Sequence, residues 1–317
     1  MSLTVGIDIG GTKIAAGVVD DDGSLVTTAR RQSPAQHPAA IADTIADLVA
    51  ELSLGRTLSA VGLAPAGWLN LDGTEIMFAP NLAWRAEPLR QLVQDRVSIP
   101  TVMENDANAA AWAEFRFGAG QGARVLLMAT IGTGIGGGLV LGGAVFHGGF
   151  GVAPEFGHMR VVPEGRPCAC GLRGCWEAYG SGNALTVRAR ELAVEDPSRA
   201  AVLLGLAGGD PDDIRGPIVS AAAERGDPAA RQSFAELARW IGEGLASLAS
   251  VLDPDVVVIG GGVGESPELR MDAVVAAFGP AESGFGHRPV PEVRRAVLGN
   301  FAGLIGAADL ARAAIRP

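Results

Sequence analysis

The sequence predicts an α/β protein made of two similar domains, each with a mixed sheet and flanking helices. Three observations support this prediction. A group of three strand-like segments followed by alternating helices and strands occurs twice along the 317 residues. Apolar residues make up 48% of the chain, which is enough for a large core. Glycine occurs 45 times, about twice its ordinary share of ~7%, without a collagen-like period, so the chain is neither fibrous nor disordered.

The first predicted domain begins with three strands. Residues 3–9 and 13–20 are rich in β-branched side chains, and residues 25–29 follow a turn of aspartate, glycine and serine. Apolar residues at helical spacing then predict a helix around residues 41–52. The rest of this half alternates, with a strand near 60–64, a helix near 88–97, a strand at 101–103 and a helix from about Ala107.

The second predicted domain restarts the pattern at Val125. Its strands are expected at residues 125–131 and 139–146, around a glycine turn, with a candidate third strand at 159–162. Helices dominate residues 184–251. The remaining elements are a strand at 255–259, a helix starting at Ser266-Pro267, a strand at 292–298 and a helix at 304–315. We expect the first domain to comprise residues 1–108 and 303–317, and the second to comprise residues 109–302.

The charge balance argues against nucleic-acid and membrane partners. The chain has 25 basic and 35 acidic residues, a net charge of −10, and no basic run. Residues 125–146 carry no charge and are long enough to cross a bilayer, but their glycines favour two short strands. The N-terminus lacks the basic region of a secretory signal. We therefore expect a cytoplasmic protein.

Three glycine turns follow apolar strands, at residues 8–13, 131–136 and 259–263. Glycine lets backbone N–H groups approach a phosphate closely, although a tight hairpin is an equally good reading of any single turn. The second turn also fits the spacing of a dinucleotide fingerprint, but a strand rather than a helix is expected after it. In the first turn, Asp8 could hold Mg²⁺ through water and Lys13 could contact phosphate; a solvated Lys13 remains the alternative.

A cluster of possible metal ligands lies in the second half of the chain. His158, Cys168, Cys170 and Cys175 form a set suited to tetrahedral zinc, and four protein ligands predict a structural ion. The second ring nitrogen of His158 would remain available for a ligand. Glu155 precedes it by three residues, and Glu177 follows the last cysteine by two. The loop is therefore expected to present these groups to a polar ligand, although Glu177 could instead be a first-turn helix acid.

A candidate general base lies between a strand end and a helix start, in the segment Glu104-Asn105-Asp106. Asn105 or Asp106 could simply cap the helix. The position favours function, because ligands of α/β sheets bind beyond the carboxyl ends of strands. A carboxylate there could accept a hydroxyl proton while the oxygen attacks a γ-phosphate.

Taken together, residues 8–13, 104–106, 155–158 and 168–177 resemble the ROK family, named for repressors, open reading frames and kinases. The resemblance spans essentially the whole chain in order. Residues 80–84, 104–112 and 300–304 look like the branch of actinobacterial ATP-dependent glucokinases. The resemblance implies two duplicated domains of the actin/hexokinase-like, ribonuclease H-like fold. It also implies that the nucleotide binds in a cleft between the domains and that closure of the cleft around the sugar excludes water.

The same resemblance implies ATP-dependent phosphorylation of the 6-hydroxyl of glucose, with Asp106 as the base, and the cofactors Mg²⁺ and structural Zn²⁺. The sugar-binding positions that it implies are Gly67, Asn81, Asn105, Asp106, Glu155, His158 and Glu177. Those on the nucleotide side are Asp8, Gly10, Gly11, Thr12, Lys13, Thr133, Gly134, Gly261 and Gly262. A homo-oligomer, dimer or tetramer, is also expected.

Other functions fit the sequence less well. A repressor of this family would carry an N-terminal helix-turn-helix, whereas the first strand is expected at about Leu3. An actin-like ATPase would have no use for Glu155, His158 and Glu177. Within the kinases, a mannose, fructose or N-acetylated aminosugar kinase, or a glucokinase that uses polyphosphate, remains the alternative.

Overall fold

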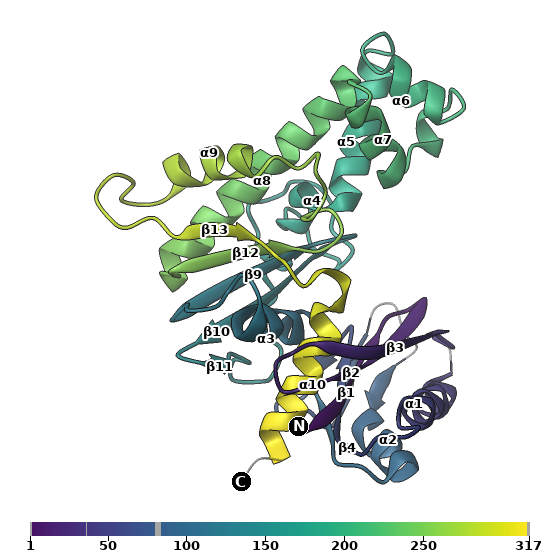
Figure 1. Cartoon of the computed structure of the whole chain (residues 1–317). Coiled ribbons are helices and arrows are strands. Elements are labelled where there is room, and N and C mark those ends of the chain that lie inside the picture. The colour runs from purple at the N-terminus through teal and green to yellow at the C-terminus, as the bar shows by residue number, and fades with distance from the viewer. Residues whose placement is uncertain (1, 36, 80–83, 316–317) are drawn as a thin grey trace. The chain divides into compact units, whose positions relative to one another are not determined.

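The computed structural model describes residues 2–35, 37–79 and 84–315, and it has two five-stranded sheets of the same strand order in this described part (Figure 1). The first sheet has the order β3-β2-β1-β4-β8, with strands Leu25–Gln32, Lys13–Val19, Leu3–Ile9, Leu58–Pro65 and Thr101–Met103. The second has the order β11-β10-β9-β12-β13, with strands Ala144–Val145, Ile135–Leu141, Val125–Ile131, Val256–Gly260 and Glu292–Arg295. The repeated order confirms the predicted duplication of a mixed α/β unit.

The chain divides into two compact units. Unit 1 comprises Met1–Leu127, Gly137–Pro154 and Val297–Pro317, and unit 2 comprises Met128–Gly136 and Glu155–Ala296. Both units are therefore discontinuous in sequence. The domain boundaries expected at residues 108 and 302 stay a prediction.

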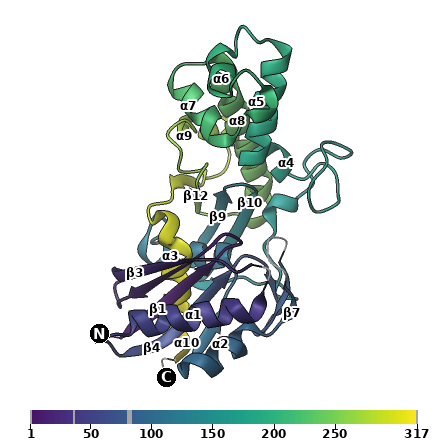
Figure 2. The ribbon, with the colours of Figure 1, turned by 90° about the vertical axis from the view of Figure 1, so that its right-hand side faces the viewer.

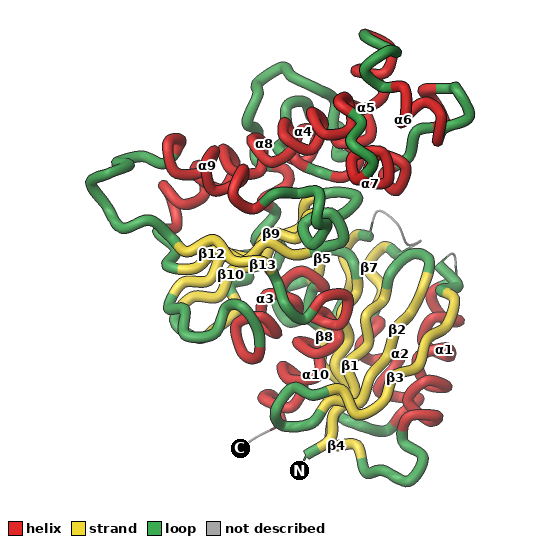
Figure 3. Tube along the Cα trace, turned by 45° about the horizontal axis from the view of Figure 1, so that its top comes forward, coloured by secondary structure: helices red, strands yellow, loops and turns green. Residues whose placement is uncertain are grey.

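One face of the first sheet packs on two helices, α1 (Pro38–Leu52) and α2 (Leu89–Val97). In β1, Val5, Ile7 and Ile9 are fully buried in this layer, together with Ile41 and Ile45 of α1. Alternate residues of a strand point to opposite faces, so the odd-numbered positions of β1 serve this core. Figure 2 shows α1 lying across the strands of this sheet, and Figure 3 shows β1, β2 and β3 side by side.

The opposite face of the same sheet carries helix α10 (Ala302–Ile315), the last element of the chain. The sheet meets this helix with glycine: a Cβ on Gly6 would lie 1.7 Å from the backbone oxygen of Leu304, and one on Gly62 would lie 1.9 Å from that of Ala307. The helix also packs on α3 (Asp106–Phe117). The expectation that the last helix packs back onto the first domain is thus confirmed.

A buried polar group fixes α10 in place. The Arg312 guanidinium, 1% exposed, donates to Asp309 Oδ1 at 2.9 Å and to Thr4 Oγ1 at 2.7 Å. The indole N–H of Trp112 in α3 donates to Asp309 Oδ2 at 2.9 Å. Because every partner in this chain of bonds is charged or polar and buried, removing one would leave another without a partner.

Unit 2 is organised around the long helix α8 (Pro228–Leu252), whose apolar side chains Phe234, Leu237, Ile241 and Leu245 are buried. It packs against α9 (Met271–Ala281), α5 (Gly182–Glu195), α7 (Gly216–Glu224) and the short α4 (Glu177–Gly180). Asp227 caps two helices, since its carboxylate accepts from Ala230 N in α8 and from Val202 N and Leu203 N in α6 (Ala201–Leu206). Helices α5, α6 and α7 group around one end of α8 (Figures 1 and 2).

The predicted boundaries of β10 and the predicted strand at 159–162 are wrong. Strand β10 begins at Ile135 rather than at residue 139, and it includes glycines that the sequence assigned to a turn. One of them is required by packing, since a Cβ on Gly138 would lie 2.4 Å from Ala111 Cβ. Residues 159–162 form no strand; Arg160 makes only an isolated bridge with Cys175.

Two further expectations near the C-terminus are corrected. No helix starts at Ser266-Pro267: α9 begins at Met271, because Arg295 binds the carbonyls of Glu265, Ser266 and Leu269. Strand β13 ends at Arg295 rather than at residue 298. The next N–H groups, of Val297 and Leu298, donate instead to the buried carboxylate of Glu114 at 2.9 and 2.8 Å.

Sequence reasoning also missed a small antiparallel sheet in unit 1, formed by β5 (Trp68–Leu69), β6 (Ile76–Phe78) and β7 (Arg85–Glu87). The uncharged stretch 125–146 forms strands, as expected, but three of them, β9, β10 and β11, rather than two. None of the helices in the described ranges has both the length and the apolar character needed to cross a membrane.

Candidate active site

The junction between β8 and α3 carries the candidate base. Asn105 is the N-cap of α3, and its side-chain oxygen accepts from Ala107 N at 2.9 Å and Asn108 N at 3.1 Å. Asp106 is the first helical residue, and its Oδ1 accepts from Ala107 N at 2.9 Å and from Asn105 Nδ2 at 3.1 Å. Asn105 is therefore the helix cap, and its side-chain amide also holds the Asp106 carboxylate at the helix N-terminus.

Another predicted site residue lies at the same junction. Asn105 Nδ2 also donates to the backbone oxygen of Gly67 at 3.1 Å. The structure thus brings Gly67, Asn105 and Asp106 together in unit 1. Asn81 lies outside the described residues.

Asp8 also lies near the start of α3, at the end of β1. A Cβ placed on Gly303 would be 4.0 Å from Asp8 Cγ and 3.8 Å from the backbone oxygen of Asp106. Burial raises the pKa of the Asp8 carboxyl above its usual range, and the Lys13 ammonium opposes this shift. The hairpin Gly10-Gly11-Thr12 between them is closed by a bond from Gly10 N to Lys13 O at 3.0 Å. A cation at Asp8 would stabilise the charged carboxylate.

In unit 2, the other two glycine turns meet. The backbone oxygen of Ile131, at the end of β9, accepts from Val263 N at 2.9 Å and Gly264 N at 3.1 Å. Gly261 has a φ of +83°, and a Cβ there would lie 2.7 Å from the same oxygen. Thr133 O accepts from Asn183 N of α5 at 3.2 Å. The predicted nucleotide-side residues Thr133, Gly134, Gly261 and Gly262 therefore belong to two neighbouring turns.

Glu177 connects the glycine turn after β9 with the cysteine loop. It is the first residue of α4, and its Oε2 accepts from Ile135 N at 2.9 Å. Its Oε1 lies 3.7 Å from Cys168 Sγ. The turn needs glycine for this approach, because a Cβ on Gly134 would lie 2.0 Å from Glu177 Oε2. The absence of a side chain at Gly134 thus leaves room for the Glu177 carboxylate, in addition to any contact of the turn with phosphate.

The predicted metal ligands are brought together in unit 2. The ligand atoms of His158, Cys168, Cys170 and Cys175 all lie within 4.8 Å of one another. Cys170 Sγ and Cys175 Sγ are 3.7 Å apart, and so are Cys168 Sγ and His158 Nδ1. A tetrahedron with Zn–S bonds of ~2.3 Å has sulfur–sulfur edges of about 3.8 Å. The four residues therefore fit a tetrahedral zinc ion.

The two ring nitrogens of His158 have different neighbours. Nδ1 of His158 points to the sulfurs, whereas Nε2 lies 4.0 Å from Glu155 Oε2. Burial raises the pKa of the Cys168 thiol to about 12, so several thiolates would coexist at neutral pH only beside a cation. A ring held through Nδ1 would keep Nε2 directed toward Glu155 Oε2.

Comparison with known proteins decides the family. A model of the ROK family matches residues 4–314. The chain belongs to the ROK family. It is 50% identical over 312 residues to a glucokinase of Streptomyces coelicolor, and the match covers 98% of each chain.

Solved structures agree with the assignment of this chain to the ROK family. The chain is similar to a ROK family glucokinase from Streptomyces griseus that was solved in complex with glucose and AMPPNP. The two share 51% identity with a TM-score of 0.88, and the match covers 98% of this chain and 100% of the other. The chain also resembles the ROK hexokinase from Thermus thermophilus, with 36% identity, a TM-score of 0.83 and 99% coverage of both chains. The actin/hexokinase-like fold class expected from the sequence is confirmed.

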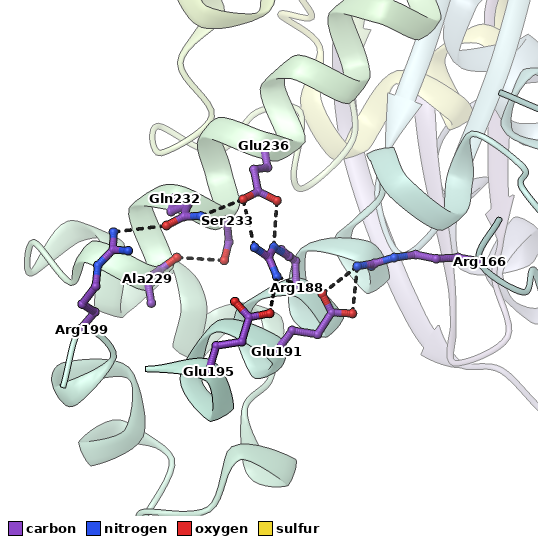
Figure 4. Close-up of polar contacts among 9 residues, drawn as sticks. All are labelled: Arg166, Arg188, Glu191, Glu195, Arg199, Ala229, Gln232, Ser233 and Glu236. Atoms are coloured by element: carbon purple, nitrogen blue, oxygen red, sulfur yellow. Dashed lines mark hydrogen bonds and ion pairs between the residues drawn. The ribbon is translucent and has the colours of Figure 1, made fainter. Parts of the chain in front are cut away.

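A network of ion pairs that sequence reasoning missed holds the cysteine loop of this ROK protein (Figure 4). Arg166, two residues before Cys168, pairs with Glu191 of α5 at 2.7 Å, and its backbone N–H donates to Tyr179 Oη at 2.7 Å. Arg188 of α5 binds the same Glu191 and also Glu236 of α8. The loop is thereby fixed to two long helices. The only sequence signal was the helical spacing of Arg188 and Glu191.

A cavity of about 510 Å³ in unit 2 is lined by Phe234 and Ala238 of α8 and by Pro267 and Arg270. It adjoins the segment that follows the turn at Gly264. Of the predicted sugar-binding residues that the structure describes, none lines this cavity.

Proposed function

We propose that this ROK protein is a glucokinase, which transfers the γ-phosphoryl group of ATP to the 6-hydroxyl of glucose. The similarity to glucokinases at 50% and 51% identity over nearly the whole chain carries the proposal. The Streptomyces griseus relative was solved with glucose and AMPPNP, a pair that matches these two substrates. The site residues support it, since Gly67, Asn105 and Asp106 lie together and the four predicted metal ligands form one cluster.

In the proposed mechanism, Asp106 is the general base. Its carboxylate accepts the proton of the sugar 6-hydroxyl as that oxygen attacks the γ-phosphorus, and the ADP oxygen leaves. The bonds from Ala107 N and Asn105 Nδ2 hold Oδ1 in one orientation, which favours a fixed attack geometry. Asn105 and Gly67 are proposed to contact the sugar next to the base.

The other hydroxyls are assigned to unit 2. We propose that Glu155, His158 and Glu177 hydrogen-bond them, with His158 using Nε2. Support comes from the geometry of the cysteine loop, in which Nδ1 of His158 faces the sulfurs and Glu155 lies beside Nε2. Zinc, held by His158, Cys168, Cys170 and Cys175, would supply structure rather than chemistry, because protein ligands fill all four positions.

The nucleotide is assigned to the glycine turns. We propose that the turns Gly10 to Lys13, Thr133-Gly134 and Gly261-Gly262 bind the phosphates of ATP through backbone N–H groups, other than that of Gly10, which donates to Lys13 O. Asp8 is proposed to hold Mg²⁺ through water. Its burial supports this role, since a buried carboxylate gains from a nearby cation.

Kinetics with a panel of sugars and donors test this proposal. The wild-type protein is incubated with glucose, mannose, fructose and N-acetylmannosamine, each with ATP or polyphosphate, and the sugar 6-phosphate is measured. We expect the highest kcat/KM for glucose with ATP and Mg²⁺. A higher value for another sugar or for polyphosphate would refute the glucokinase proposal but keep a ROK kinase. Light scattering on the same sample tests the expected dimer or tetramer, and the cytoplasmic location stays a prediction.

A further inference from the structure

Glu104, the residue directly before the N-cap of α3, is an almost buried carboxylate with no assigned role. It is 8% exposed. Its Oε1 accepts from the backbone N–H of Asn105 at 2.9 Å and from Asn108 Nδ2 at 3.1 Å. Oε1 of Glu104 is therefore hydrogen-bonded to the start of α3 at Asn105 and at Asn108, on either side of the proposed base Asp106.

The other oxygen of Glu104 is held by a histidine from a distant part of unit 1. His147 Nε2 lies 2.7 Å from Glu104 Oε2. His147 follows strand β11, in a segment with no regular structure up to Pro154. The hydrogen bond and the negative charge of Glu104 raise the pKa of His147, while partial burial opposes the shift. The histidine thus satisfies a carboxylate oxygen that the fold has removed from water.

The segment after His147 leads directly to another proposed sugar-binding residue. Ala153 N donates to the backbone oxygen of His147 at 3.1 Å, so the loop closes on itself. Pro154 and Glu155 follow in the chain. His147 is therefore held in unit 1 both by its ring and by its backbone oxygen.

We propose that His147 is a positioning residue of the phosphoryl-transfer site, acting through Glu104 on Asn105 and Asp106. The inference rests on the proposed function. Its basis is the His147–Glu104 contact, because the same carboxylate also accepts from the backbone N–H of Asn105, the residue before the proposed base.

The effect should be large because the contact is short and its acceptor is buried. Without the imidazole, Glu104 Oε2 has lost its donor, and the side chain must turn toward water or recruit one. Either movement disturbs the Oε1 bond to Asn105 N. A displacement of ~1 Å at a reacting group costs up to ~100-fold in rate. A neutral imidazole still donates from Nε2, so this role does not require a proton transfer.

The test compares His147→Ala with His147→Gln, whose amide N–H can replace Nε2–H. His287→Ala is the control, because His287 is exposed and lies in a loop of unit 2. We expect His147→Ala to raise KM for glucose and lower kcat, with kcat/KM falling ~10–100-fold, while KM for ATP stays within about twofold. His147→Gln should recover kcat/KM to within about threefold of wild type, and His287→Ala should equal wild type. In a Glu104→Ala background, His147→Ala should cause no further loss in kcat.

Several results would overturn the inference. A folded His147→Ala protein with wild-type kcat/KM refutes it, as does an equal rise in KM for glucose and ATP. If His147→Ala does not fold, His147→Gln decides, and a folded Gln variant with more than a tenfold loss refutes the positioning role. A wild-type protein that phosphorylates no hexose refutes the proposed function itself, whereas an active wild type beside an unaffected variant refutes only the role of His147.

Discussion

The variant Asp106→Asn tests whether the Asp106 carboxylate acts as a base, because asparagine can keep the hydrogen bonds of the side chain but cannot take up a proton. In the structure, Asp106 Oδ1 accepts from Ala107 N at 2.9 Å and from Asn105 Nδ2 at 3.1 Å. The amide oxygen of asparagine can accept both bonds, so the start of α3 should keep its conformation. What the substitution removes is the carboxylate's ability to take the proton of the sugar hydroxyl.

The expected loss follows from the size of general-base catalysis. A positioned base contributes typically ~10²–10⁴-fold, which corresponds to ~3–5 kcal/mol of activation free energy at ~1.4 kcal/mol per tenfold. Stability should change little, because a first-turn carboxylate at a helix N-terminus contributes only ~0.3–1 kcal/mol. The variant should therefore lose kcat by two to four decades, as an order of magnitude, and retain its affinity for glucose.

The assay measures kcat by a coupled reaction that detects glucose 6-phosphate, and the Kd of glucose by calorimetry. Asp47→Asn on the exposed face of α1 serves as the matched control for loss of one negative charge. A kcat of Asp106→Asn within tenfold of wild type would show that Asp106 is not the base. If the variant instead lost much of its affinity for glucose but kept its kcat, Asp106 would bind the sugar without acting as the base.

Three other predictions follow from the geometry. Cys170→Ser should lose bound zinc, measured by elemental analysis, and unfold at a lower temperature; a metal-free, active variant of normal stability would contradict a structural zinc site. Gly134→Ala should lower kcat/KM at least tenfold, because the new Cβ would collide with Glu177 Oε2. Gly132→Ala is the control, because the space around its new methyl group is open, and its kcat/KM should stay within about threefold of wild type. Equal losses of kcat/KM in the two variants would refute the role of the Gly134–Glu177 contact. His147 has a raised pKa in the folded protein, so its ion pair with Glu104 stabilises fully below pH ~6.5 and is lost as pH rises through the folded-state pKa. The stability lost in His147→Gln should thus shrink between pH 6 and pH 9 in thermal melts, and a pH-independent difference would contradict the pairing.

The elements that the sequence predicted well are those with a regular apolar pattern. The helical spacing of apolar residues predicted the helices within residues 184–251, α8 among them, and the β-branched residues of β1 and β2 predicted the strands of the first hairpin. Where the prediction failed, a distant residue decided the outcome. Arg295 takes the carbonyls that a helix at Ser266 would need, and Glu114 takes the N–H groups that would extend β13. No local pattern contains that information.

The candidate site divides in the same way. The metal ligands could be predicted because three of them lie within eight residues, and the geometry of the cluster agrees with zinc. A helix cap at Asn105 or Asp106 was also predicted, and the structure shows that Asn105 is the cap. In contrast, His147 meets Glu104 across 43 positions of sequence, so the pair becomes visible only when the fold is known.

The excess of glycine in this chain has two structural causes that composition alone does not separate. Gly134 and Gly261 lie in the turns assigned to the nucleotide, whereas Gly6 and Gly62 lie inside strands and let α10 rest directly on the sheet. The two groups are connected through function. The first turn of α10, at Gly303, lies beside both the Asp8 carboxyl and the backbone of Asp106. A side chain at Gly6 or Gly62 would push α10 away from the sheet, and it would thereby change the surroundings of both proposed catalytic carboxylates without touching either one.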